Sequence, residues 1–171
     1  MIRRAKASDA ASIASIYNYY ILNSSTTFEE AAVDEQIIQS RIIAHDRLNW
    51  WVYEIDNQIV GYTYATIWKP RSAYRFTVET SIYITEKYQL KGIGVKLYAH
   101  LIEELRAGGF HTLLAGISLP NDISVRFHEK LGFRKVGQLE EVGYKFNRWI
   151  DVGYWELNLK KLTSPPWKIL P

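Results

Sequence analysis

Apolar side chains recur at helical spacing in two stretches near the start of the chain. The first stretch follows Ser8 and Asp9, either of which can cap a helix by accepting backbone N–H bonds, and it predicts a helix over residues 9–22. The second stretch predicts a helix over residues 33–44, where an acidic pair favours the positively polarised helix N-terminus. Residues 23–31 between the two helices are expected to form a loop.

Runs of alternating or continuous apolar residues predict the strands of a sheet. The first two runs are joined by a tight turn at Asp56-Asn57 and form a hairpin. The expected strands span residues 50–55, 58–68, 76–85, 112–118, 134–143 and 148–159. A third helix is expected to end at Gly108-Gly109, and a fourth to run from Pro120 to Gly132. The alternation of strands and helices after the hairpin indicates an α/β fold in three layers, with helices on both faces of a mixed sheet.

Length and composition bound the class of protein further. The 171 residues fit one ordinary domain, expected at residues 1–162, followed by a proline-rich tail at residues 163–171. The net charge of +3 arises from scattered charges, which argues against a nucleic-acid partner. The chain has no cysteine and four dispersed histidines, so we expect chemistry without a metal. It also shows no apolar run of signal-peptide or membrane-span length, which predicts a cytoplasmic protein without membrane contact.

A glycine-containing turn carries the first candidate chemistry. Gln89-x-x-Gly92-x-Gly94 follows a strand and opens a helix, a context in which backbone N–H groups hold phosphate oxygens. The dinucleotide fingerprint needs a third glycine where Leu97 stands, and the Gly-Lys-Ser/Thr of the Walker loop is missing, so both of those nucleotide sites are excluded. Taken alone, such a turn is more often a plain connection between a strand and a helix.

Glu79 carries the second candidate chemistry, in the middle of the strand before that turn. Even-numbered positions of residues 76–84 share one face of this strand, and Glu79 belongs to the other. A carboxylate among apolar neighbours is seldom buried alone. Glu79 therefore either forms a structural salt bridge or faces a cavity as a base.

Together with the helix from Asn121 to Gly132-Phe133, these motifs resemble the acetyl-CoA-binding core of the GNAT superfamily of N-acetyltransferases. Within that superfamily the chain is similar to the phosphinothricin N-acetyltransferases, from about Ile2 to the Pro165-Pro166 tail. The segments that carry this similarity are Trp68-Lys69-Pro70-Arg71-Ser72-Ala73-Tyr74, Thr77-Val78-Glu79, Leu119-Pro120-Asn121-Asp122, His128-Glu129-Lys130-Leu131-Gly132-Phe133 and Gly143-Tyr144-Lys145. Five such segments in the family's order make chance similarity improbable.

The resemblance implies a mixed, mostly antiparallel sheet that is splayed at the acetyl-CoA site. The pantetheine arm would bond backbone groups of one strand and lie against Asn121, and the pyrophosphate would bind the glycine-containing turn. The implied cofactor-binding residues are Ile82, Tyr83, Ile84, Gln89, Leu90, Lys91, Gly92, Ile93, Gly94, Val95, Asn121 and Ser124. Asn121 is also suited to cap its helix, and an amide side chain can fill both roles.

The resemblance also implies catalytic and substrate-binding residues. Glu79 matches the general base, and His128 stands where many GNAT enzymes carry a proton-donating Tyr, although a helical His facing the core is equally a packing residue. The implied acceptor-binding residues are Phe28, Lys69, Arg71 and Tyr74. Two cations and two rings suit a compact anion, whereas the alternative is a solvated basic loop. Family members are commonly homodimers, and a homodimer is expected here.

The leading hypothesis is therefore an enzyme that acetylates the amino group of phosphinothricin, methionine sulfoximine or methionine sulfone, with a role in detoxification. A second hypothesis is acetylation of a natural amino acid or another small amine, because one fold serves many acceptors. A third is a sensor that binds acyl-CoA without turnover. Glu79 favours an enzyme over a sensor, because binding alone does not require a base.

Overall fold

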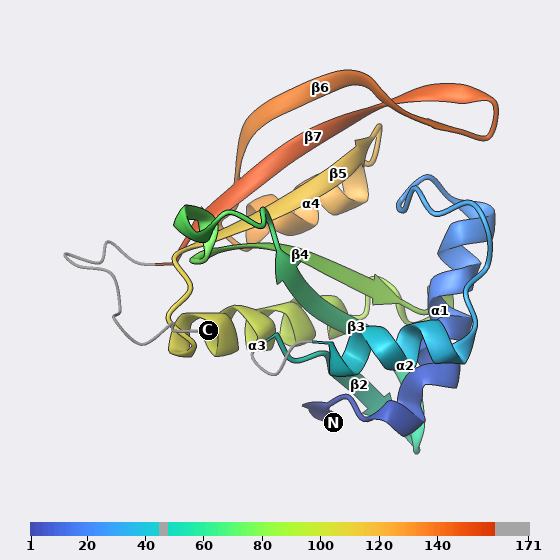
Figure 1. Cartoon of the computed structure of the whole chain (residues 1–171). Helices are drawn as coiled ribbons and strands as arrows, with labels where there is room; N and C mark the ends of the chain where they lie inside the picture. Colours follow the sequence, from blue (N-terminus) through green and yellow to red (C-terminus); the bar gives the residue numbers. More distant parts are fainter. Residues whose placement is uncertain (45–47, 160–171) are drawn as a thin grey trace.

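A seven-stranded sheet forms the centre of the molecule, with strands in the order β1-β2-β3-β4-β5-β7-β6 (Figure 1). The computed structural model describes residues 1–44 and 48–159. The strands are β1 (Ile2–Arg4), β2 (Trp51–Ile55), β3 (Gln58–Ile67), β4 (Thr77–Ile84), β5 (Thr112–Leu119), β6 (Arg134–Lys145) and β7 (Arg148–Asn158). Within the described residues β4 and β5 pair in parallel and the other neighbours pair antiparallel. The sheet is thus mixed and mostly antiparallel, as predicted.

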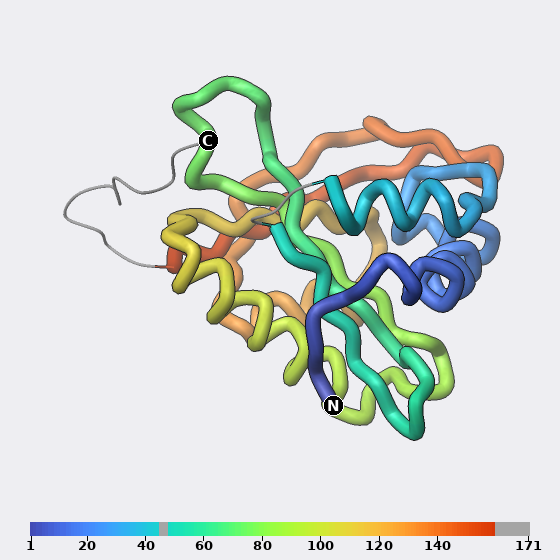
Figure 2. Tube along the Cα trace, turned by 60° about the horizontal axis from the view of Figure 1, so that its bottom comes forward, coloured from blue at the N-terminus to red at the C-terminus, as the bar shows by residue number. Residues whose placement is uncertain are grey.

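Helices cover both faces of this sheet. They are α1 (Ala10–Asn23), α2 (Glu35–Ile43), α3 (Ile93–Ala107) and α4 (Asp122–Lys130), with single 3-10 turns η1 (Ala7–Asp9), η2 (Ser72–Tyr74) and η3 (Glu86–Tyr88). One apolar cluster joins α1 and α2 to the sheet, and a second joins α3 and α4 to it. Figure 2 shows α3 and the α1–α2 pair on opposite sides of the strands. The predicted three-layer α/β architecture is confirmed.

The sheet opens between β4 and β5. Their ladder pairs residues 77–79 with residues 112–114 and then ends, although both strands continue. Figure 1 shows the two strands diverging beyond this short ladder. The continuing part of β4 is paired with β3 on one edge only, so backbone groups on its other edge face the opening.

The two faces of β4 have different neighbours. Val78 belongs to the cluster under α3, and the Thr80 hydroxyl contacts the Tyr98 hydroxyl of α3 at 2.5 Å. Tyr83 belongs instead to the cluster under α1. This confirms the predicted alternation and places Glu79 on the same face as Tyr83.

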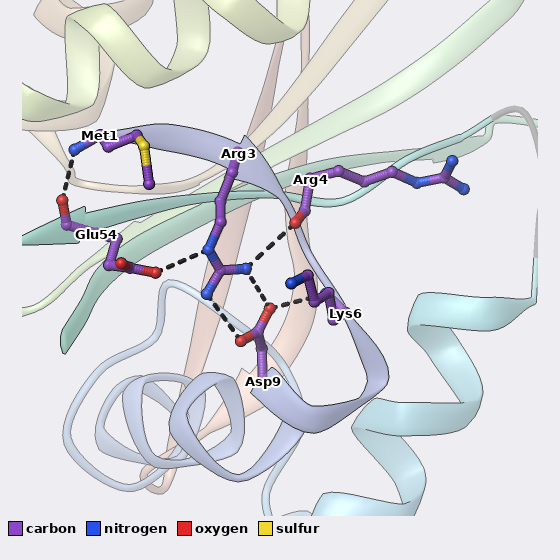
Figure 3. Close-up of polar contacts among 6 residues, drawn as sticks. All are labelled: Met1, Arg3, Arg4, Lys6, Asp9 and Glu54. Atoms are coloured by element: carbon purple, nitrogen blue, oxygen red, sulfur yellow. Dashed lines mark hydrogen bonds and ion pairs between the residues drawn. The ribbon is translucent and has the colours of Figure 1, made fainter. Parts of the chain in front are cut away.

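The chain start differs from the prediction. Asp9 does not cap α1. Its carboxylate instead accepts the Lys6 backbone N–H at 2.7 Å and two bonds from Arg3 at 2.7 and 3.0 Å (Figure 3). Arg3 also donates to Glu54 at 2.7 Å, and its bonds lower the pKa of Asp9. The network ties β1 to β2 and to η1, a long-range arrangement that no local helix signal contains.

The other predicted elements are confirmed with shifted ends. The second helix begins at Glu35 because Asp34 is its cap, accepting the Ile37 backbone N–H at 2.8 Å. Strand β1 and the three 3-10 turns were not predicted, because each spans three residues and is too short to show a period. The predicted tail at residues 163–171 lies outside the described residues. In the part of the chain described, no helix is long and apolar enough to span a membrane.

Candidate active site

A cavity of about 290 Å³ lies where the sheet opens. Three parts of the chain form its wall: the segment after α1, the diverging strands, and the β6–β7 hairpin. The lining residues are Ser25, Thr26, Phe28, Glu79, Gly116, Ser118, Leu139, Val142, Val152 and Tyr154. Glu79 is charged, and it is surrounded by small, apolar and aromatic side chains, so the cavity offers a carboxylate to a small ligand.

Glu79 ends the short ladder between β4 and β5. Burial raises the pKa of its carboxyl above the ordinary value, and the positive charge of Lys69 partly opposes this. Among the described residues Glu79 forms no ion pair, so the salt-bridge alternative is not supported. Gly116 on β5 makes room for it, since a Cβ atom there would lie 2.9 Å from Glu79 Oε1.

The start of α3 forms a second part of the site. Leu90 and Gly92 have positive φ angles of 57° and 78°, which turn the chain sharply from η3 into the helix. The backbone N–H groups of residues 93–95 open the helix and have no acceptor four residues before them within it. A Cβ atom at Gly92 would meet nothing within 4 Å, so the turn is open to a ligand. The arrangement fits a phosphate group held by backbone N–H groups and the helix dipole.

Side chains around this turn are partly engaged elsewhere. The Gln89 amide donates to the Tyr20 hydroxyl at 2.9 Å, and that hydroxyl donates to the Ile84 carbonyl at 2.5 Å. The ladder between β4 and β5 ends at Glu79, so the edge of β4 at the buried residues Tyr83 and Ile84 offers its backbone groups to a ligand. The Lys91 ammonium lies 5.4 Å from the centre of the Tyr88 ring, on the exposed side of the turn.

At the start of α4, Asn121 accepts the Ser124 backbone N–H at 3.1 Å, which is the capping role. Four residues after Ser124, His128 is buried and bonded through both ring nitrogens. Its Nδ1 lies 2.8 Å from the Ser124 carbonyl oxygen, which can only accept, so Nδ1 carries the proton. Nε2 then accepts from the Tyr98 hydroxyl at 3.1 Å. Burial lowers the pKa of His128 to about 4, and the ring is neutral at neutral pH.

The four predicted acceptor-binding residues fall in two places. Phe28 lines the cavity with Glu79. Lys69, Arg71 and Tyr74 lie on the connection between β3 and β4, outside that lining, with Lys69 and Arg71 exposed. Of these three, Lys69 acts on Glu79 through its charge.

Of the residues that line the cavity, the sequence predicted only Phe28 and Glu79 as site residues and missed the others, among them Gly116 and Tyr154. Burial raises the pKa of the Tyr154 hydroxyl, and the negative charge of Glu79 raises it further. Gly116 and Tyr154 both lie in strands that the sequence predicts, at residues 112–118 and 148–159. The strand register is what brings the two residues together, because Gly116 pairs with Tyr154 across β5 and β7.

An opened mixed sheet, a helix N-terminus with open backbone N–H groups and a half-buried carboxylate in a cavity together fit an α/β enzyme domain that acts with a phosphate-bearing co-substrate. The model of the acetyltransferase (GNAT) domain matches residues 2–153. A phosphinothricin N-acetyltransferase from Streptomyces viridochromogenes is 40% identical over 171 residues, covering 99% of this chain and 93% of that protein. An L-methionine sulfoximine/L-methionine sulfone acetyltransferase from Salmonella typhimurium is 34% identical, with 96% and 97% covered.

A solved structure agrees with these relatives. The crystal structure of a GNAT superfamily phosphinothricin acetyltransferase from Sinorhizobium meliloti, in complex with acetyl-CoA, superposes with a TM-score of 0.93 at 32% identity. The match covers 100% of this chain and 95% of that one. The chain belongs to the GNAT acetyltransferase family.

Proposed function

We propose that this enzyme transfers the acetyl group of acetyl-CoA to the amino group of phosphinothricin or of the related methionine sulfoximine and sulfone. The observation that carries the proposal is the half-buried Glu79 carboxylate, which forms no ion pair within residues 1–44 and 48–159, in a small cavity at the opening of the sheet. The names of the two relatives above supply the class of acceptor. Detoxification of such compounds in the cytoplasm is part of the same proposal.

Acetyl-CoA is the donor, and the residues present fit it. Its pyrophosphate would be held by the backbone N–H groups of residues 93–95, with Lys91 adding charge. Its pantetheine arm would bond the free edge of β4 at residues 82–84, next to Asn121 and Ser124 of α4. When bound, acetyl-CoA supplies an acetyl group activated as a thioester.

Glu79 would act as the general base. An amino group with a pKa near ~8 is largely protonated at neutral pH, so a proton must leave before nitrogen can attack the carbonyl carbon. Glu79 would take this proton, directly or through water, and the thiolate of coenzyme A would leave as the C–S bond breaks. Its raised pKa makes Glu79 a stronger proton acceptor than an ordinary carboxylate.

The β3–β4 connection would recognise the anionic end of the acceptor. Lys69 lies near enough to lower the pKa of Glu79, and Arg71 has a forked guanidinium suited to a carboxylate or phosphinate. The ring of Tyr74 packs edge-on against Trp68 at 5.0 Å between centroids and supports this segment. Phe28 would contact the side chain of the acceptor from the opposite wall.

For His128 we propose the packing role. Both nitrogens are engaged with groups of α3 and α4, and the neutral ring lies outside the cavity lining. A low pKa also leaves almost no charged imidazolium at neutral pH to protonate a leaving thiolate.

The test is a steady-state assay of coenzyme A release, with purified enzyme and these acceptors alongside common amino acids. We expect Glu79→Gln to lower kcat/KM by roughly 10²–10⁴-fold, because general base catalysis typically contributes that much. The variant should bind acetyl-CoA as the wild type does in calorimetry. The wild-type profile should fall at acid pH as Glu79 is protonated, whereas the rate of Glu79→Gln should follow the neutral fraction of the amine and fall already below a pH of about 8.

Glu104→Gln is the matched control, since Glu104 is exposed on α3 far from the cavity lining, and it should retain full activity. A Glu79→Gln enzyme with near wild-type kcat/KM would refute the base assignment. Turnover of common amino acids alone would keep the reaction and replace the acceptor.

A further inference from the structure

Lys145 is a buried cation outside the machinery described so far. It ends β6 and is 2% exposed. Its ammonium donates to the backbone carbonyls of Ser24 at 3.0 Å and Thr27 at 2.8 Å, which lie 121 and 118 positions earlier in the chain. These bonds fasten the β6–β7 hairpin to the segment after α1. In Figure 1 the two parts reach toward each other at the right of the molecule.

The segment held by Lys145 is also anchored from the side of α1. The Tyr17 hydroxyl lies 2.7 Å from Thr27 Oγ1 and donates to Glu29 at 3.0 Å. Glu29 in turn pairs with Arg41 of α2 at 2.8 Å. The side chain of Thr27 therefore bonds α1, while its carbonyl bonds the hairpin.

Both parts joined by Lys145 contribute to the wall of the cavity. Residues 25, 26 and 28 come from the segment after α1, and residues 139 and 142 come from the hairpin. The Phe28 ring lies so close to Gly143 that a Cβ atom there would overlap it. Lys145 thus stands two residues from the contact that sets the position of Phe28.

The charge of Lys145 is costly in this place. Burial lowers the pKa of its ammonium, opposed by the charges of Glu30 and Glu29. An apolar side chain of similar length would fill the same volume without desolvating an ammonium group. What the ammonium adds is a pair of directional, charge-assisted bonds to two carbonyls of one loop.

We propose that Lys145 is a positioning residue for the acceptor: it holds residues 24–28 against the hairpin and so keeps Phe28 in the cavity wall. The inference rests on the proposed function of the cavity as the acceptor site. It gives Lys145 no contact with the donor or with the reacting atoms.

Kinetics of Lys145→Met test the inference. We expect the KM for the acceptor amine to rise about tenfold or more, because two charge-assisted bonds that order the wall are lost. kcat should change less than about threefold, and the KM for acetyl-CoA should be unchanged. Lys135→Met is the matched control, since Lys135 lies exposed on the same strand, and its KM values should equal those of the wild type.

Gly143→Ala provides a second variant that keeps the lysine. The added methyl group displaces the Phe28 ring, so the acceptor KM should rise as in Lys145→Met. If both variants fold and leave the acceptor KM unchanged, the inference is wrong.

Hydrogen exchange separates this inference from the proposed function. In Lys145→Met the amides of residues 24–28 should exchange at least about tenfold faster, with the core of α3 unchanged. Unchanged exchange in this segment would overturn the inference even if the enzyme acetylates phosphinothricin. A wild type that turns over none of the acceptors would refute the proposed function instead, and faster exchange would still support the role of Lys145 in holding the loop.

Discussion

Single residues in this domain acquire their proton chemistry from burial. The same desolvation raises the pKa of Glu79 and lowers that of His128, because it disfavours the charged form of each. Glu79 becomes a better base, and His128 becomes a neutral hydrogen-bonding group. The sequence left both residues with two roles, and their burial and hydrogen-bond partners separate these roles.

The pH dependence of stability checks the state of His128. Its folded pKa of about 4 lies below the ordinary value of 6.5, so as pH falls the unfolded chain takes up the proton first. The stabilisation is complete above pH 6.5 and is lost toward pH 4, at up to about 1.4 kcal/mol of unfolding free energy per pH unit. When the free energy of unfolding is measured by urea denaturation at a series of pH values, its slope against pH between 6.5 and 4 should be shallower for His128→Asn than for the wild type. An equal slope in both proteins would contradict a neutral, buried His128.

At the level of elements, the two helix N-termini at the site differ in construction. α3 begins after a glycine with φ of 78° and leaves its first N–H groups open, whereas α4 begins at a capping amide. Asn121 uses its oxygen for the cap, which leaves its NH₂ group for a ligand. The cap and the proposed donor contact are therefore separable.

Asn121→Ser tests this separation. A Ser hydroxyl caps a helix about as well as Asn, so the free energy of unfolding should stay within about 0.5 kcal/mol of the wild type. The KM for acetyl-CoA should rise several-fold, because the amide donors are lost. Asn121→Ala should show the same KM and also lose about 1 kcal/mol of stability. A wild-type KM in Asn121→Ser would assign the residue to capping alone.

The elements with a clear period could be predicted from the sequence, and so could the strand that carries Glu79. The layers followed from the order of these elements. The wall of the cavity could not be predicted, because Phe28, Gly116 and Val142 meet through tertiary contacts between distant segments. The Arg3–Asp9–Glu54 network was hidden for the same reason, since Asp9 has a local alternative as a cap.

At the scale of the whole molecule, the β6–β7 hairpin carries an exposed apolar surface. β6 is an edge strand, and the hairpin exposes a set of large apolar side chains: Val136, Leu139, Val142, Tyr144, Phe146 and Trp149. Apolar patches of this kind on a sheet edge are typical of interfaces. We propose that this hairpin would form the interface of the homodimer that the sequence resemblance implies.

Light scattering after size exclusion tests the dimer. We expect the wild type to have twice the mass of one chain and Trp149→Glu to have the mass of one, because a buried charge would disfavour the interface. Ile67→Glu is the control, an equally apolar and exposed position on β3, and it should remain dimeric. A monomeric wild type would exclude the proposal.

The three-residue ladder between β4 and β5 also divides the sheet by chain order. Strands β1–β4 precede α3 in the chain, and β5–β7 follow it. Glu79 comes from the first group, whereas Gly116 and Tyr154 come from the second. During synthesis the strand that carries Glu79 is therefore translated before the strands that form the opposite wall of the cavity. The complete cavity exists only after β7 has been translated, so a product that terminates before β7 lacks part of the cavity wall.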